Sequence, residues 1–403
     1  MRKIIALLTA SLFIFFINLS CKKDKDKDKD DENTEESLSI ELAVSPCPVY
    51  FVNMQGSSVS SYNGPTSIAE KWSTRLGDEF CQSLVIGADG TIFVCGQREL
   101  YAVSADGALK WTFKTDFLSL CPAPVVDKNG VVYIAGYKSI KTGTTQGAVI
   151  AVKADGSEKW RFNSPDSLVG GFFHAPTIGL EGYLYVGEQN TKTMYALDGA
   201  KNIKWQFKAD YPITSSAIIA PDKTIYFSTY DLSSSLGAMI ALGEMGTKKW
   251  EFIDKASFTT PAIMPNGNIC LGIGYKLIEI KPDGSQRYSR TIAGGYPSSP
   301  LVVSSETIYT YAHNDNFNAL MAHKGGLEIL NIQSSYGIPT MDNSGLLYLL
   351  SNASIVVYDP INKVQKTDYN IGAGTLSLSG KLVIGNGVIY IATSTGYLKA
   401  LGQ

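Results

Sequence analysis

The side chains that most often carry catalysis or bind metals are sparse in this sequence of 403 residues. Its three histidines, His174, His313 and His323, stand far apart along the chain. A protein zinc site needs three or four converging Cys, His or carboxylate ligands, and a hydrolytic site needs a base beside its nucleophile. Neither spacing occurs around these histidines, and the sequence shows no phosphate-binding loop. We therefore predict neither a multi-histidine metal site nor a hydrolase.

Several carboxylates are better explained as turn residues. Asp89, Asp106, Asp155 and Asp283 each stand directly before a glycine. An Asp-Gly pair favours a tight turn, because glycine adopts a positive φ without steric cost. We expect these four side chains to shape hairpins rather than to bind a cation or accept a proton.

The tryptophans have the most regular spacing of any residue type. They are separated by 39, 49, 45 and 45 residues, and Tyr288 continues the series 38 residues later. An alanine stands nine residues before four of them, as in "YAVSADGALKW" at 101–111. The chain therefore repeats a unit of this length. The five tryptophans are Trp72, Trp111, Trp160, Trp205 and Trp250.

Each repeat has the signals of four short strands separated by turns. Strand-like runs such as "TIYFS" at 224–228 alternate with glycine-rich turns, and the composition of 38 Gly, 22 Tyr and 16 Phe favours an all-β fold. A four-stranded sheet cannot bury both of its faces alone, whereas copies stacked in a ring can. The sequence predicts an all-β protein, a β-propeller of four-stranded antiparallel blades.

Eight segments have the pattern of a fourth strand. The C-terminal sequence has the pattern of a first, second and third strand but no fourth. Residues 69–77 have the pattern of a fourth strand, but no first three strands precede them. Pairing the N- and C-terminal strands would close a ring of eight blades and remove its open edges. Rings of seven or nine blades are the alternatives. The predicted fourth strands are 70–75, 109–114, 158–163, 203–208, 248–253, 286–291, 327–332 and 363–368.

We predict a structural role for Trp72, Trp111, Trp160, Trp205 and Trp250. On the outermost strand of a blade, an indole ring can lie flat against the backbone of the next blade and bury about 150–250 Å². Five copies around a ring cannot all face one cofactor. The alternative, stacking on a quinone, therefore cannot account for most of them.

The pattern A-x-x-x-x-G-x-x-x-W resembles the tryptophan-docking repeat of pyrroloquinoline-quinone (PQQ)-type propellers, and the whole arrangement resembles the PQQ-like (BamB-like) family. The resemblance covers roughly 64–403 and implies the fold more specifically than the function, because this fold serves many tasks. Quinoprotein dehydrogenases of this type use Ca²⁺, an Asp base and often adjacent cysteines. This sequence has no adjacent Cys pair. We expect no cofactor and no catalysis, with a quinoprotein or carbohydrate-active enzyme as the alternative.

The N-terminus has the parts of an export signal. Residues 1–20 contain a basic start and an apolar run of fourteen residues, too short to span a bilayer. The Ser20-Cys21 pair resembles a bacterial lipobox, in which Cys21 becomes lipidated; a plain secretory peptide is the alternative. Residues 21–37 are highly charged and predict a disordered tether. We expect an outer-membrane lipoprotein displayed on the cell surface, with a periplasm-facing position as the alternative.

The remaining chain divides into a lead-in segment, 38–68, and the propeller, 69–403. Five further cysteines do not form a complete disulfide framework, although Cys81 and Cys121 occupy the same position in successive units. A net charge of −2 gives no reason to expect a nucleic-acid partner. We expect a monomer that contacts the membrane only through lipidated Cys21.

The loops that join one unit to the next would share one face of the propeller. Each contributes an aromatic residue, so we interpret them as a ring around the mouth of the central channel that could receive a glycan or a protein segment. The alternative is that they pack between blades. The candidate mouth residues are Phe80, Phe117, Phe172, Phe173, His174, Tyr211, Phe258, Tyr296 and Tyr336.

Two connections between the second and third strands, 137–147 and 228–237, are longer than the others, and the polar 312–319 joins them. Loop insertions on one face of a repeat protein commonly carry binding. The sequence therefore favours a non-catalytic binding or scaffold module for an envelope protein, a BamB-like accessory of outer-membrane assembly. A surface-exposed glycan-binding propeller is the alternative.

Overall fold

Strands are the only regular secondary structure in the described part of the chain. The computed structural model describes residues 38–49, 51–77, 80–120, 123–141, 144–165, 174–298, 302–314, 317–333, 339–350, 354–371 and 382–403. Across these ranges, no helix has the length and apolar character that crossing a membrane requires.

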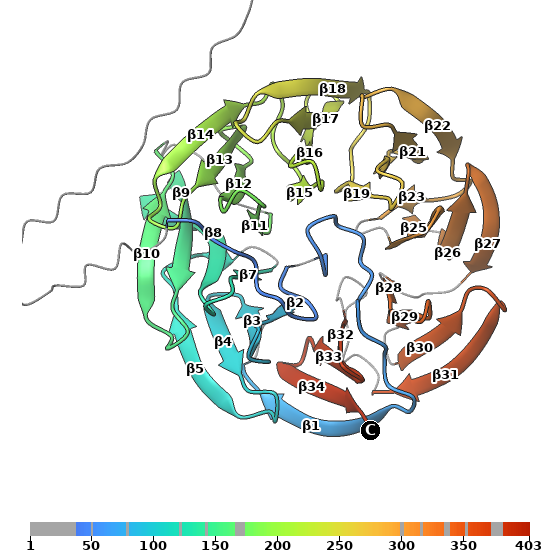
Figure 1. Ribbon diagram of the computed structural model, residues 1–403, viewed down its shortest axis with the longest axis horizontal. Helices are drawn as coiled ribbons and strands as arrows, with labels where there is room; N and C mark the ends of the chain where they lie inside the picture. Colours follow the sequence, from blue (N-terminus) through green and yellow to red (C-terminus); the bar gives the residue numbers. More distant parts are fainter. Residues whose placement is uncertain are drawn as a thin grey trace, which may run out of the picture. The chain divides into compact units, whose positions relative to one another are not determined.

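Eight antiparallel sheets stand around a common axis, each with its first strand innermost and its fourth strand outermost (Figure 1). This arrangement confirms the predicted eight-bladed β-propeller, and the alternatives of seven and nine blades are wrong. Each sheet stays small because tight turns end its strands, and its two faces are buried by its neighbours.

The first four blades follow directly along the chain. Blade 1 consists of β2 (Phe80–Ile86), β3 (Ile92–Gly96), β4 (Glu99–Val103) and β5 (Leu109–Lys114). Blade 2 consists of β6 (Ser119–Leu120), β7 (Val125–Val126), β8 (Val132–Lys141), β9 (Thr144–Val152) and β10 (Glu158–Asn163). Blade 3 consists of β11 (Thr177–Ile178), β12 (Leu184–Glu188), β13 (Thr193–Leu197) and β14 (Ile203–Lys208). Blade 4 consists of β15 (Ile218–Ile219), β16 (Ile225–Asp231), β17 (Leu236–Leu242) and β18 (Lys248–Asp254).

The remaining blades complete the ring. Blade 5 consists of β19 (Ala262–Ile263), β20 (Ile269–Ile273), β21 (Lys276–Ile280) and β22 (Gln286–Thr291). Blade 6 consists of β23 (Tyr296–Pro297), β24 (Val302–Ser304), β25 (Thr307–Asn314), β26 (Phe317–Lys324) and β27 (Leu327–Gln333). Blade 7 consists of β28 (Thr340–Met341), β29 (Leu347–Leu350), β30 (Ser354–Asp359) and β31 (Val364–Asn370). Blade 8 consists of β32 (Val383–Gly385), β33 (Val388–Ala392), β34 (Tyr397–Gly402) and β1 (Ala69–Arg75).

Blade 8 closes the ring with strands from both parts of the chain. Its outermost strand β1 pairs antiparallel with β34, from Ala69 opposite Gly402 to Arg75 opposite Tyr397. The N-terminal strand β1 and the three C-terminal strands therefore form one sheet, as predicted. The pairing covers the edge that β34 would otherwise expose, and β1 becomes the outermost strand of blade 8.

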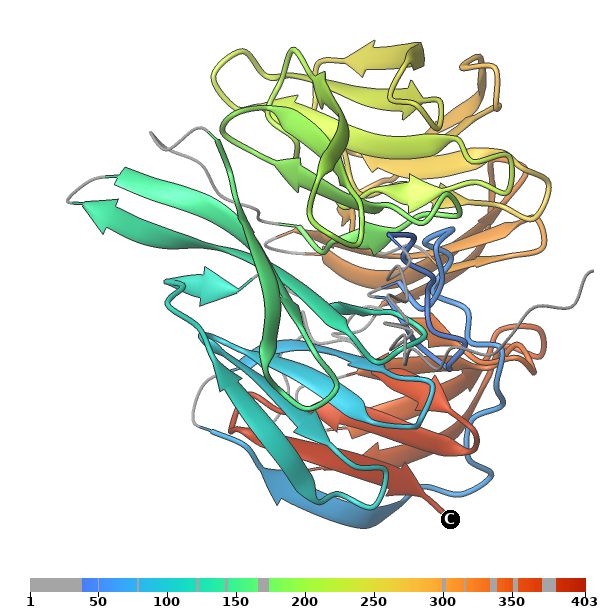
Figure 2. The ribbon, with the colours of Figure 1, turned by 60° about the vertical axis from the view of Figure 1, so that its left-hand side comes forward.

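The long connections between second and third strands are extensions of the strands themselves. In blade 2 the pairing of β8 with β9 continues to Lys141 opposite Thr144, where a loop was expected. In blade 4, β16 and β17 pair to Asp231 opposite Leu236, and β25 and β26 of blade 6 pair to Asn314 opposite Phe317. We call these the three hairpin arms; Figure 2 shows the β8–β9 arm projecting from the ring.

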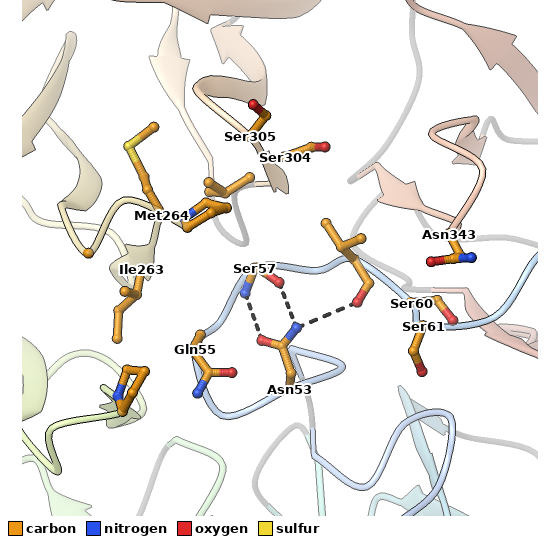
Figure 3. A pocket seen from close by; sticks show the side chains of 15 residues that line it. Asn53, Gln55, Ser57, Ser60, Ser61, Ile263, Met264, Ser304, Ser305 and Asn343 are labelled. Carbon is orange, nitrogen blue, oxygen red and sulfur yellow. Dashed lines mark hydrogen bonds between the residues drawn. The ribbon is translucent and has the colours of Figure 1, made fainter.

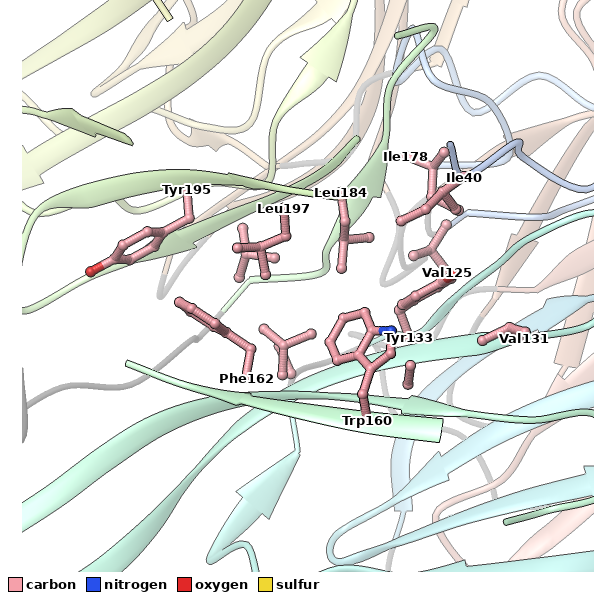
Figure 4. Close-up of a cluster of buried hydrophobic side chains, with 14 of the residues drawn as sticks. Ile40, Val125, Val131, Tyr133, Trp160, Phe162, Ile178, Leu184, Tyr195 and Leu197 are labelled. Atoms are coloured by element: carbon pink, nitrogen blue, oxygen red, sulfur yellow. The ribbon is translucent and has the colours of Figure 1, made fainter. Parts of the chain in front are cut away.

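The hydrophobic core lies between blades rather than within one. Trp160 and Phe162 of blade 2 pack with Leu184, Tyr195 and other residues of blade 3, in one cluster of buried side chains (Figure 4). Similar clusters occupy the other joints among the described residues. A blade therefore owes its stability to its neighbours.

Candidate functional site

The tryptophans make the same contact at five joints. Each indole Nε1 donates a hydrogen bond to a backbone carbonyl in the turn between the third and fourth strands of the next blade. The distances are Trp72 to Ala105, 3.0 Å; Trp111 to Ala154, 2.8 Å; Trp160 to Gly199, 2.8 Å; Trp205 to Glu244, 2.9 Å; and Trp250 to Pro282, 2.8 Å.

The glycine of the repeat lies under the tryptophan of the preceding blade. Gly246 has a φ of 76°, and a Cβ built on it would lie 2.7 Å from Cδ2 of Trp205. Gly107 has the same relation to Trp72, and Gly284 to Trp250. The alanine of the repeat pairs with the tryptophan of its own blade across the third and fourth strands. The residues of the motif lie within one blade, whereas the contacts of its tryptophan and its glycine stabilise the joints with the neighbouring blades.

Three joints have no tryptophan. Tyr288 of blade 5 packs against Gly326 of blade 6, and by strand register Leu330 and Thr367 stand at the equivalent positions of blades 6 and 7. Near the joint of blades 5 and 6, the buried His323 has no hydrogen-bond partner on either ring nitrogen among the described residues. Burial, opposed by Glu328 and supported by Arg290, lowers the pKa of His323.

Two residues of the predicted mouth are buried between blades. Phe117 is 1% exposed and packs over Gly136, with the Arg161 guanidinium 5.7 Å from its ring centre. Phe258 is 6% exposed and packs over Gly237. These two rings fill space that glycine leaves open, which agrees with the alternative interpretation that the aromatics pack between blades.

Three of the other mouth residues have side chains that the structure describes, and the rest do not. Tyr296 is 41% exposed and stacks on Tyr275, with 3.9 Å between ring centres, whereas Tyr211 is half-buried. His174 is also half-buried, and desolvation lowers its pKa to about 4. The side chains outside the described residues are those of Phe80, Phe172, Phe173, Tyr336, Cys81 and Cys121, so any pairing of the two cysteines also lies outside them.

The segment 38–64, which the sequence suggested only as a lead-in, lies across the ring at the turns between first and second strands (Figure 1). We call it the central segment, and we call that side of the ring the segment face. Its backbone exchanges hydrogen bonds with all eight blades. From blade 1 to blade 8 the pairs are Cys47 with Ile86, Ala43 with Val126, Ile40 with Gly182, Met54 with Ile219, Gln55 with Ile263, Ser57 with Val303, Ser58 with Met341, and Asn63 with Gly387.

Between this segment and blades 4 to 7 lies a cavity of about 460 Å³ (Figure 3). Asn53 shapes its wall, because its amide nitrogen donates to Ser57 Oγ at 2.6 Å and its amide oxygen accepts from the Ser57 nitrogen at 3.2 Å. Sequence reasoning missed this site. The one available signal was the cluster of Asn, Gln and Ser in 53–61, which has no strand partner of its own.

Three of the four hairpin aspartates shape their turns through hydrogen bonds, as the sequence predicted. The Asp89 carboxylate accepts from the Thr91 nitrogen, and Asp155 and Asp283 accept in the same way from Ser157 and Ser285. These hydrogen bonds contribute to a pKa below the usual range in each of the three carboxyl groups. Within the described residues, no three His, Cys, Asp or Glu side chains gather in a way that could hold a metal ion.

One family model matches residues 145–365, more than half of the chain, and its description is outer membrane protein assembly factor BamB. The chain belongs to this BamB-like propeller family. No curated protein sequence matches the chain.

Solved structures share the ring at low sequence identity. BamB of Moraxella catarrhalis is 12% identical, with a TM-score of 0.62, over 84% of this chain and 98% of that one. Virginiamycin B lyase of Staphylococcus aureus is 11% identical, with a TM-score of 0.52, over 84% and 100%. A streptogramin B lyase is 10% identical, with a TM-score of 0.51, over 83% and 97%. At these identities the similarity shows the fold alone.

Proposed function

We propose that this chain is a non-catalytic lipoprotein of the cell envelope whose propeller binds a protein partner as an accessory of outer-membrane protein assembly. The family description names that process. The N-terminal sequence supports an envelope location, because 1–20 resembles an export signal and Cys21 stands where a lipoprotein would carry its lipid. In this proposal 21–37 is a tether, and surface display is favoured over a periplasm-facing position.

The observation that carries the binding role is the contrast between the two faces of the ring. The segment face is spanned by the central segment, which is bonded to every blade. The opposite face bears the three hairpin arms, and we call it the hairpin face. Ile140, near the tip of the β8–β9 arm, is 47% exposed, and Leu232, at the tip of the β16–β17 arm, is 82% exposed. Insertions on one face of a repeat protein often form its binding surface, and these two side chains give the arms apolar groups that a protein partner could cover.

Photo-crosslinking in cells tests this proposal. A photoreactive residue at Leu232 should capture an envelope protein. The matched control is Ile361, which is also 82% exposed but lies in a turn between third and fourth strands, on the segment face. Equal capture from both positions, or capture from neither, would contradict a partner site on the hairpin face.

The envelope location has its own readout in the same cells. Cys21→Ala should release the protein from the membrane fraction, and added protease should cleave the anchored form on intact cells. Retention of Cys21→Ala in the membrane fraction would count against lipidation, and resistance to the protease would favour the periplasm-facing alternative.

A catalytic role receives no support from the residues described. The lyases share the ring at 10–11% identity, which carries no inference about chemistry. A titration with PQQ and Ca²⁺ should give neither an absorbance change nor a rise in Tm. A saturable response to both would instead favour a quinoprotein.

A further inference from the structure

The cavity on the segment face has features of a binding site that the partner-binding role does not use. Its volume of about 460 Å³ lies within the range of small-molecule sites, about 300–1,000 Å³. It lies on the opposite side of the ring from the hairpin arms. Its walls come from the central segment and from the turns after β15, β19, β24 and β28, so four consecutive blades contribute.

The chemistry of the wall is neutral. None of the described residues that line the cavity carries a charge; more than half of them have hydroxyl or amide side chains. The exposed rings of Pro221 and Pro265 add rigid apolar surface at the rim. A charged ligand would lose hydration here without gaining a counter-charge, so the site favours an uncharged one.

Five of the polar side chains that line the cavity fall into two sets. Asn53, Gln55 and Ser57 are held by bonds within the protein, including Gln55 Nε2 to the Ile219 carbonyl at 3.3 Å. Among the described residues, the side chains of Ser304 and Asn343 take part in no hydrogen bond, and Figure 3 shows them on the side of the cavity away from Asn53 and Gln55. The first set fixes the shape of the cavity, and the second offers donors and acceptors to a ligand.

An extended peptide fits this site poorly. A peptide strand binds through a row of free backbone N–H and C=O groups. The inner strands here already form backbone hydrogen bonds with the central segment. The nitrogens of Ile219, Ile263 and Val303 donate to carbonyl oxygens of the central segment. What remains is a set of separate hydroxyl and amide groups, each able to donate and to accept. Such groups match a ligand that presents many hydroxyls at different angles.

We propose that the cavity on the segment face binds a neutral carbohydrate. Sugar hydroxyls pair with the side chains of Ser304 and Asn343 and with the remaining lone pairs of Gln55. The C–H faces of the sugar lie against Pro221 and Pro265. This site is separate from the partner site on the hairpin face, so either one can fail without the other.

Titration calorimetry of the full-length protein, in a detergent without a sugar headgroup, tests the site. The probes are neutral gluco-, manno- and galacto-configured trisaccharides, the corresponding uronic-acid trisaccharides and a neutral tripeptide. We expect at least one neutral trisaccharide to bind with one-to-one stoichiometry. Ser304→Ala and Asn343→Ala should each raise its Kd about three- to tenfold, the effect of one lost hydrogen bond. Asn343→Trp, which places a large ring at the cavity, should abolish binding.

Ser289→Ala is the matched control, because Ser289 is an exposed serine on the outer strand β22, outside the cavity. Its Kd should equal that of the unchanged protein. Thermal unfolding of each variant checks the fold, and if Asn343→Trp does not fold, Ser304→Ala decides. The proposal is overturned if no neutral trisaccharide binds, if binding is unchanged in Ser304→Ala and Asn343→Ala, or if the uronic acids or the peptide bind more tightly.

Discussion

The ring has two regions whose blades are joined differently. From blade 8 through blade 1 to blade 5, every joint has a tryptophan whose Nε1 reaches a backbone carbonyl of the next blade. From blade 5 to blade 8, Tyr288, Leu330 and Thr367 occupy the equivalent positions. An indole fills the joint and has its single donor satisfied.

The second region contains buried polar atoms that have no hydrogen-bond partner among the described residues. His323 is buried without a hydrogen-bond partner among the described residues, and Nε of Arg290, on the neighbouring blade, is also buried without one. A buried polar atom that loses water and gains no partner costs about 1–3 kcal/mol. The central segment is bonded to the blades of this region through Val303, Met341 and Gly387, as it is to the other blades, so the difference between the two regions lies in the joints themselves.

The largest expected effect comes from removing one tryptophan. Trp205→Ala should lower the free energy of unfolding by about 3–5 kcal/mol, because it deletes a large interblade contact and leaves a cavity. Thr367→Ala, at the equivalent position of blade 7, should change it by less than about 0.5 kcal/mol, since Thr367 is exposed. Urea unfolding followed by tryptophan-independent far-UV circular dichroism compares the two. Similar losses in both variants would mean that the joints are equivalent.

Part of this architecture could be predicted from sequence because it is local and repeated. The fourth strand at 109–114 agrees with β5, Leu109–Lys114, since turn, alanine and tryptophan recur at fixed offsets. The sequence predicted loops where the hairpin arms lie, although the β-branched Thr144 and Thr145 extend β9 into the expected loop.

The central segment could not be found in the same way. Its contacts, such as Met54 with Ile219, join residues far apart in the chain and repeat no motif. The exposure of the predicted mouth residues could not be predicted from sequence either. An aromatic residue in a loop looks alike in the sequence whether it is buried, as Phe117 is over Gly136, or exposed, as Tyr296 is, because the residues that it packs against lie in other strands.

A smaller effect tests whether close contact with the indole sets the docking geometry. Gly246→Ala should lower the free energy of unfolding by about 2–4 kcal/mol, because alanine at positive φ costs about 1–2 kcal/mol and the new Cβ meets the Trp205 ring. Gly387 has the same φ of 76° but no atom within 4 Å of its Cβ position. Gly387→Ala should therefore show the backbone cost alone. If the two variants lose the same stability, the ring contact is not tight.

The smallest effect has the opposite sign and belongs to the region without tryptophan. His323→Leu should raise the free energy of unfolding by about 1 kcal/mol at pH 7, because it removes a buried polar group that lacks a partner. The pKa of His323 lies below its ordinary value when folded. As pH falls below about 6.5, the unfolded chain therefore binds a proton that the folded chain does not, and the free energy of unfolding decreases. His174, with a pKa of about 4, contributes in the same direction.

Urea unfolding at pH 7.0 and 5.5 separates the two histidines. The loss of stability on acidification should be reduced in His323→Leu and should persist in part, because His174 still titrates. His313, which is exposed, supplies the matched control, and His313→Leu should leave the pH dependence as it is. If His323→Leu instead lowers the stability at pH 7, the imidazole has a partner, and the joint between blades 5 and 6 is as well satisfied as those that tryptophan holds.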